Sequence, residues 1–112
     1  MRRLAMGTAA LAALVATGAA AMADDDVGPG SASQGRRFAL QTCAICHLVT
    51  PKQLVPRHLA VAPSFGAIAN MNSTTASSLH AFLSTPHSIM PNLVLTRQEQ
   101  RDVITYILSL KR

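Results

Sequence analysis

The sequence predicts a small all-α domain organised around a bound cofactor. The chain has 112 residues, enough for one small domain but too few for a doubly wound sheet, a barrel enzyme or a kinase. Its apolar residues recur at helical spacing, and no run alternates as a half-buried strand would. It has only four aromatic side chains and no tryptophan, so it lacks core material for a domain of this size. Such domains often depend on a disulfide, a metal or a cofactor.

Residues 1–23 are predicted to form a secretory signal peptide. Two arginines follow the initial methionine, and the next 20 residues carry no charge. This apolar stretch ends in Ala21-Met22-Ala23, which is typical of a small-x-small cleavage site. An uncleaved membrane anchor is the alternative, because about 20 apolar residues span a bilayer. The abundance of alanine, glycine and threonine in the stretch favours cleavage.

Residues 24–31 are predicted to be a flexible acidic tail, and residues 32–112 the folded domain. Removal of Arg2 and Arg3 leaves 8 of the 10 basic residues against 5 acidic ones, a formal charge of +3. No basic run is interleaved with aromatic residues, so the composition gives no support to nucleic-acid binding. The positive charge indicates either an acidic protein partner or a role in solubility alone.

The first predicted helix covers residues 33–42 and leads directly into the two cysteines. Residues 48–72 contain three prolines and are predicted to be a long loop, with a short helical turn at 64–70. A loop of that length is uncommon in a compact domain, but it is reasonable if the loop wraps around a cofactor.

Two further helices follow the loop. Ser73 or Thr74 is expected to cap the second main helix, which ends before Pro86. Thr96-Arg97-Gln98-Glu99 is a capping box that opens the final helix. The predicted apolar face of that helix consists of Val103, Ile104, Ile107, Leu108 and Leu110.

The only two cysteines lie in the motif Cys43-Ala44-Ile45-Cys46-His47. Cys-x-x-Cys-His is the signature for covalent attachment of c-type haem. Cysteines three apart on a helical turn face the same way and can each form a thioether, and His47 can then bind the iron. A thioredoxin-like pair, a zinc site and a structural disulfide are weaker interpretations, since none of them explains both the spacing and the histidine.

The iron also needs a second axial ligand for electron transfer, or an open position for chemistry. Met71 and Met90 are the methionines beyond the predicted leader. Met90 is favoured, because Pro91 restricts it to an extended conformation and because it lies further along the chain from His47. Met71 is expected to pack against the haem or a helix. The alternative ligands are His58, His80 and His87.

This order of features resembles small class I cytochromes c, the bacterial periplasmic proteins with one haem and His/Met ligation. The resemblance covers residues 32–112 and rests on the Cys43–His47 and Met90–Leu93 motifs. It implies three main helices and a long loop wrapped around one covalently attached haem c. The stretch 52–60 departs from the family, because it lacks the familiar glycine-rich start of the loop.

The resemblance also implies roles for individual residues. In the family, the first and last helices cross through a glycine and aromatic residues, and the matching positions are Gly35, Phe38 and Tyr106. A loop proline carbonyl accepts the proton of the ligating histidine, and Pro63 is the matching residue. The other residues expected around the haem are Phe65, Met71, Pro91, Asn92 and Arg57. Asn92 either donates a hydrogen bond, to the methionine sulfur or to a haem propionate, or is a turn residue. Arg57 either pairs with a propionate or is solvated.

The expected function is that of a periplasmic electron carrier, not an enzyme, whose haem iron alternates between Fe(III) and Fe(II). One alternative is a cytochrome subunit of a periplasmic dehydrogenase or oxidase. The other is a ligand-binding or catalytic haem protein, which would need an open sixth position. The expected partners are redox proteins, with acidic ones favoured, and the protein is expected to be a monomer or a subunit of a redox complex, without stable membrane insertion once the leader is removed.

Overall fold

The computed structural model describes residues 29–53 and 62–112, and within these ranges the chain is helical and has no strand. The predicted all-α class is thereby confirmed. The predicted leader and most of the acidic tail lie outside the described residues. The four helices are α1 (Ala32–Thr42), α2 (Phe65–Ala69), α3 (Ala76–Ser84) and α4 (Arg97–Ser109). None of the helices in the described ranges is long and apolar enough to cross a membrane.

The helix starts follow local capping chemistry. The Ser31 side chain accepts the first-turn amide of Gln34 at 3.4 Å and begins α1. At α4 the Thr96 hydroxyl accepts the amide of Glu99 at 3.2 Å, and the Glu99 carboxylate accepts the amide of Thr96 at 2.8 Å. The predicted capping box is therefore present, and it satisfies two amides that the helix itself leaves without partners.

The predicted start of α3 is wrong by one or two positions. The capping residue is Thr75, not Ser73 or Thr74, and Ser78 closes the capping box with it. Thr74 is buried instead, and its hydroxyl donates to the Ile68 carbonyl at 2.6 Å. Thr74 is unavailable as a cap because its side chain fastens the end of α2 to the following turn.

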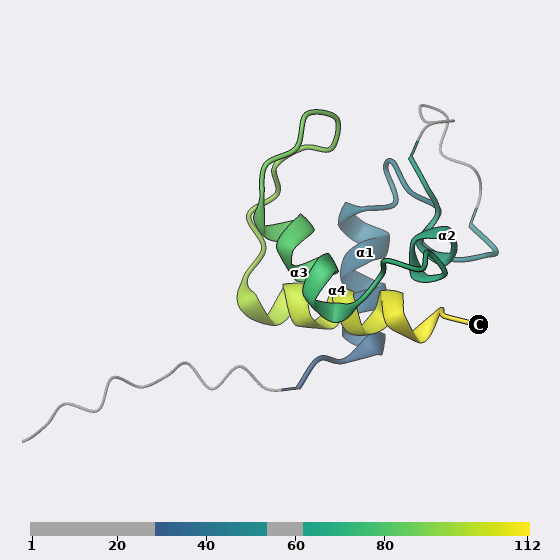
Figure 1. The fold of residues 1–112 in the computed structure, drawn as a ribbon. Helices are drawn as coiled ribbons and strands as arrows, with labels where there is room; N and C mark the ends of the chain where they lie inside the picture. The colour runs from purple at the N-terminus through teal and green to yellow at the C-terminus, as the bar shows by residue number, and fades with distance from the viewer. Residues whose placement is uncertain (1–28, 54–61) are drawn as a thin grey trace, which may run out of the picture.

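The most extensive helix–helix contact is the steep crossing of α1 and α4, seen in Figure 1. Gly35 lies at the crossing point, where an added Cβ would overlap the carbonyl oxygen of Asp102 on α4 and press on the Cβ of Tyr106. Only glycine lets the two backbones approach so closely. One turn further along α1, the side chain of Ala39 is fully buried.

The carboxylate of Asp102 strengthens the same crossing. Asp102 is 7% exposed, and its Oδ1 accepts the amide of Ser31 at 2.7 Å and the side-chain amide of Gln98 at 2.8 Å. The first of these bonds joins the N-cap of α1 to the middle of α4. Two donors compensate this buried oxygen for its lost hydration.

The predicted apolar face of α4 forms the centre of the core. Val103 and Ile107 are almost fully buried, and Ile104 is 8% exposed. Leu108 and Leu110 are partly buried at the edge of the same cluster. Besides α1, α4 also contacts α2 and α3, which lie on different sides of the crossing (Figure 1). α4 thus supports both α2 and α3.

Candidate haem site

The cysteine motif forms a single tight turn at the end of α1. Cys43 is the C-cap of the helix, and its carbonyl accepts the amides of Cys46 at 3.1 Å and His47 at 2.9 Å. Both cysteines are free and half-buried. The side chain of Ile45, between them, is 68% exposed. The turn therefore presents both sulfur atoms to the same interior space and turns Ile45 toward solvent.

The environment of Cys43 favours an uncharged sulfur. Burial, followed by the neighbouring Cys46, raises the pKa of the Cys43 thiol from 9.0 to about 11. A thiolate at this position is disfavoured at neutral pH, whereas a thioether carries no charge and loses nothing by burial. The position therefore suits a thioether better than a charged metal-ligating or redox-active thiolate.

The side chain of Gln53 supports the cysteine motif through hydrogen bonds to the backbone, a role that the sequence did not reveal. Its Oε1 accepts the amide of Val49 at 2.8 Å, and its Nε2 donates to the carbonyls of His47 at 3.0 Å and Ala44 at 3.3 Å. One side chain thus satisfies three backbone groups of a segment with no regular structure. A glutamine in a loop has no spacing or motif that would signal such a role.

The ring of His47 is fixed by its Nδ1 atom, which lies 2.6 Å from the carbonyl oxygen of Pro63. A carbonyl can only accept, so Nδ1 carries the proton and the neutral ring keeps its lone pair on Nε2. Histidine ligands of metals have this arrangement, because the second nitrogen sets the tautomer and the orientation of the ring. His47 is therefore prepared to bind an iron through Nε2.

Phe65 links His47 to the helical core. Its ring lies 5.5 Å from the His47 ring and 6.3 Å from the ring of Tyr106, measured between centroids. The Tyr106 hydroxyl donates to the carbonyl of Val49 at 2.8 Å. The position of the candidate iron ligand thus depends on contacts that reach α4.

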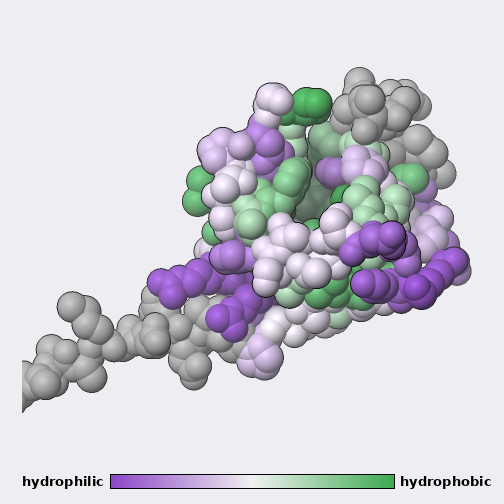
Figure 2. All heavy atoms as spheres, viewed as in Figure 1, coloured by the Kyte–Doolittle hydropathy of each residue, from purple (hydrophilic) through white to green (hydrophobic). Residues whose placement is uncertain are grey.

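A cavity of about 600 Å³ lies beside the motif. In Figure 2, hydrophobic side chains surround a hollow between the α3 side and the α2 side of the molecule. Of the residues predicted around the haem, the cavity is lined by Cys43, Cys46, His47, Met90, Pro63, Phe65, Met71 and Pro91. Asn92 is exposed and does not line the cavity, and Arg57 lies outside the described residues. Of the residues predicted at the helix crossing, Gly35 and Tyr106 lie there, and Phe38 lines the cavity.

The two methionines and the other histidines are placed differently. Met71 and Met90 both line the cavity, so the preference for Met90 still rests on its place in the sequence and on the following proline. His87 lines the cavity too. His80 is exposed on α3 and does not line it, and His58 lies outside the described residues.

The cavity fits a haem in its chemistry. Most of its lining is apolar, as a macrocycle requires, and none of the described residues that line it is a lysine, arginine, aspartate or glutamate. A histidine with a free Nε2 and a thioether are both within the lining, and these are ligands that haem iron accepts. The paired sulfur atoms lie on the same turn as that histidine. Among the described residues, no three His, Cys, Asp or Glu side chains form a separate metal-binding group.

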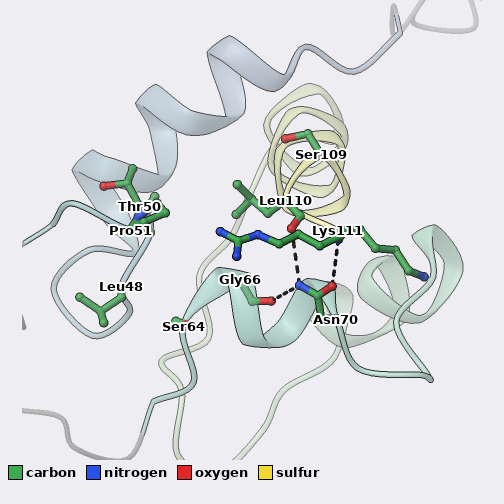
Figure 3. Close-up of a pocket in the computed structure, with 11 residues that line it drawn as sticks. Leu48, Thr50, Pro51, Ser64, Gly66, Asn70, Ser109, Leu110 and Lys111 are labelled. Atoms are coloured by element: carbon green, nitrogen blue, oxygen red, sulfur yellow. Dashed lines mark hydrogen bonds between the residues drawn. The ribbon is translucent and has the colours of Figure 1, made fainter.

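A second cavity, of about 490 Å³, lies near the C-terminus and has no such chemistry. Figure 3 shows Asn70 within it, donating to the Gly66 carbonyl at 2.8 Å and accepting the amide of Arg112 at 2.9 Å. None of the described residues that line this cavity is a cysteine, histidine or methionine. Its hydrogen bonds join the end of the chain to α2.

Comparison with known proteins shows that the chain is similar to a small cytochrome. Over 80 residues the sequence is 38% identical to cytochrome c-552 of Bradyrhizobium diazoefficiens, a match that spans 71% of this chain and 75% of the relative. No family model and no solved structure matches the chain.

Proposed function

This chain belongs to the small class I cytochromes c, haem-containing electron carriers with a covalently bound haem c, and on that premise we propose that it is a periplasmic carrier that moves one electron at a time between redox proteins. It performs no catalysis of its own. The proposal places residues 1–23 in a leader that is removed after export, residues 24–31 in an acidic tail and residues 32–112 in the electron-transfer domain.

The observation that carries the proposal is the pairing of His47 with Pro63 at the wall of an apolar cavity. Cys43 and Cys46 would attach the haem, and His47 and Met90 would hold its iron. Haem c supplies an iron that accepts and returns one electron. The protein contributes the thioether ligand, which raises the reduction potential, and an apolar enclosure that excludes water.

Ligation by His47 and Met90 predicts a reversible carrier rather than a ligand-binding protein. In the purified holoprotein we expect one reversible one-electron transition, and we expect no change in the ferrous spectrum when carbon monoxide is added. An optical redox titration, repeated under carbon monoxide, checks both. Rapid carbon monoxide binding by the unmodified protein would contradict the carrier and support the ligand-binding alternative. A fixed subunit of a dehydrogenase or oxidase would instead co-purify with its complex.

The proposed partners are acidic redox proteins, and the surface supplies two features for docking. Arg36 and Arg37 are exposed on α1, and Arg97 and Arg101 are exposed on α4. In the loop that carries Met90, the side chain of Ile89 is 90% exposed. The positive groups would steer an acidic partner, and the apolar side chain would then be covered.

Electrostatic steering predicts opposite salt effects for small reagents of opposite charge. Oxidation of the ferrous protein by ferricyanide should slow by roughly tenfold or more between about 0.01 M and 0.15 M ionic strength, as the screening length falls from about 30 Å to about 8 Å. Oxidation by a cationic cobalt(III) complex should speed up over the same range. Stopped-flow rates check both. Flat profiles for both reagents would remove the steering role and leave apolar docking.

A further inference from the structure

A buried glutamine, Gln100, lies on the side of α4 that faces α3. Its side chain is 9% exposed, and it shares the helical spacing of the core residues Val103 and Ile107. A buried amide costs free energy unless it is hydrogen-bonded. Both N–H groups of Nε2 have acceptors on α3, namely the hydroxyl oxygen of Ser84 at 2.9 Å and the carbonyl oxygen of His80 at 3.4 Å. Gln100 therefore holds the last turn of α3 against α4.

The same residue closes the base of the loop that carries Met90. This loop covers residues 85–96, between Ser84 at the end of α3 and the start of α4. The side chain of Gln100 is bonded to Ser84 at one end of the loop. Its backbone amide donates to the carbonyl of Thr96 at the other end, at 3.0 Å. One residue outside the loop therefore joins both of its ends.

The first residues of the loop are fixed to the helix that Gln100 holds. The hydroxyl of Thr85 donates to the Ala81 carbonyl of α3 at 2.9 Å. Nδ1 of His87 lies 2.7 Å from the Thr85 carbonyl, to which it must donate because a carbonyl can only accept. The His87 ring also packs against the ring of Phe82, with centroids 3.9 Å apart. The chain is thus folded back onto the end of α3 as far as His87, and Met90 follows within the same loop.

We propose that Gln100 is a positioning residue that holds Met90 at the haem iron by fixing the base of the loop 85–96. This inference rests on the proposed function, because it requires Met90 to be an iron ligand. Met90 lines the haem cavity and Gln100 does not, so Gln100 acts through the loop and not by touching the haem. Joining the ends of a loop lowers the conformational entropy that ligation by one of its residues would otherwise cost.

The competing role for Gln100 is structural, with hydrogen bonds that only compensate a buried amide. Gln100→Leu separates the two roles, because leucine fills the same position without a donor. Ser84 is exposed, so water can replace the donor that its hydroxyl loses. A structural role predicts no change in ligation at the iron. A positioning role predicts that Met90 is displaced from the iron more easily.

The test is the affinity of the ferric holoprotein for cyanide, which must displace Met90 to bind. For Gln100→Leu we expect the affinity to rise roughly threefold to tenfold, as the loss of about one hydrogen bond implies. Ser84→Ala removes one acceptor at an exposed position, and it should raise the affinity by a smaller factor. An unchanged affinity in Gln100→Leu would overturn the proposal. If that variant does not fold, an unchanged affinity in Ser84→Ala would overturn it.

Gln98→Leu is the matched control, since Gln98 is the same residue type on the same helix. Its Nε2 donates to Asp102 at 2.8 Å and to the Pro29 carbonyl at 3.4 Å, and neither of these acceptors belongs to α3 or to the loop. Cyanide affinity should therefore be unchanged in Gln98→Leu. A rise equal to that of Gln100→Leu would overturn the proposal, because it would indicate general loosening of the domain.

The Met90→Ala background tests whether Gln100 acts through Met90. Adding Gln100→Leu to Met90→Ala should not raise the cyanide affinity further, because no thioether remains to be held at the iron. A further rise of the same size as in the unmodified background would overturn the proposal. If Met90→Ala alone leaves the affinity unchanged, or if the purified protein has a mass that lacks haem, the proposed function itself is refuted, and the role of Gln100 with it.

Discussion

Replacing Cys43 and Cys46 together by alanine is expected to abolish both haem attachment and the folded state. Without haem, the buried hydrophobic core of the described residues contains only nine side chains, and two of these are alanines. The apolar walls of a cavity of about 600 Å³ would then have no haem to pack against. We expect the whole free energy of unfolding, about 5–15 kcal/mol for a domain, to be lost. Mass spectrometry after denaturation and far-ultraviolet circular dichroism measure the two effects.

The single variants serve as graded controls for this experiment. Cys43→Ala and Cys46→Ala each leave one thioether, so each should retain some covalently bound haem and part of the helical signal. The unmodified protein should keep its haem on denaturation and should have the mass of the polypeptide plus one haem. A folded double variant with haem still covalently attached would disprove attachment through this motif.

Replacing Met90 by alanine should open the sixth position of the iron. The weak far-red band of iron–thioether ligation should disappear from the ferric spectrum, and the reduction potential should fall, because the thioether favours the ferrous state. Cyanide and carbon monoxide would no longer compete with a protein ligand. If that competition is worth about 2.8 kcal/mol, their affinities should rise about 100-fold. Absorption titrations with the two ligands measure the change.

Met71→Ala is the matched control, because Met71 lines the same cavity and is also a methionine. It should keep the far-red band and should leave ligand affinities near those of the unmodified protein. Its side chain is 45% exposed, so its truncation should also cost little stability. If Met71→Ala removes the band and Met90→Ala does not, the two methionines must exchange roles.

Local signals in the sequence were sufficient to predict most of the helices. The short helix α2 lies within the predicted turn at 64–70, and the capping box at Thr96 and Glu99 is present. These features depend on side chains within four residues of one another, so they can be predicted from the sequence alone. The predicted start of α3 was wrong because it too relied on local signals. Thr74 is a suitable capping residue by sequence, but its hydroxyl donates to the Ile68 carbonyl instead.

Contacts made through the fold could not be predicted. Gln53 supports the cysteine turn through backbone groups whose positions exist only in the folded chain. His87 was considered as an alternative iron ligand, but nothing in the sequence indicated that its Nε2 would be buried without a hydrogen-bond partner among the described residues. The motif at Cys43–His47 was informative because its chemistry is fixed by spacing alone.

The crossing at Gly35 also has a consequence for the order of events during synthesis. α1 has 11 residues and α4 has 13, and helices of this length are marginal in water until they pack. α1 and α4 lie far apart in the sequence of the domain. α1 therefore cannot be stabilised by this contact until α4 has left the ribosome. The cysteine turn lies between them in sequence. A nascent or translocating chain is therefore expected to keep both thiols accessible, and folding around them waits until α4 has been synthesised.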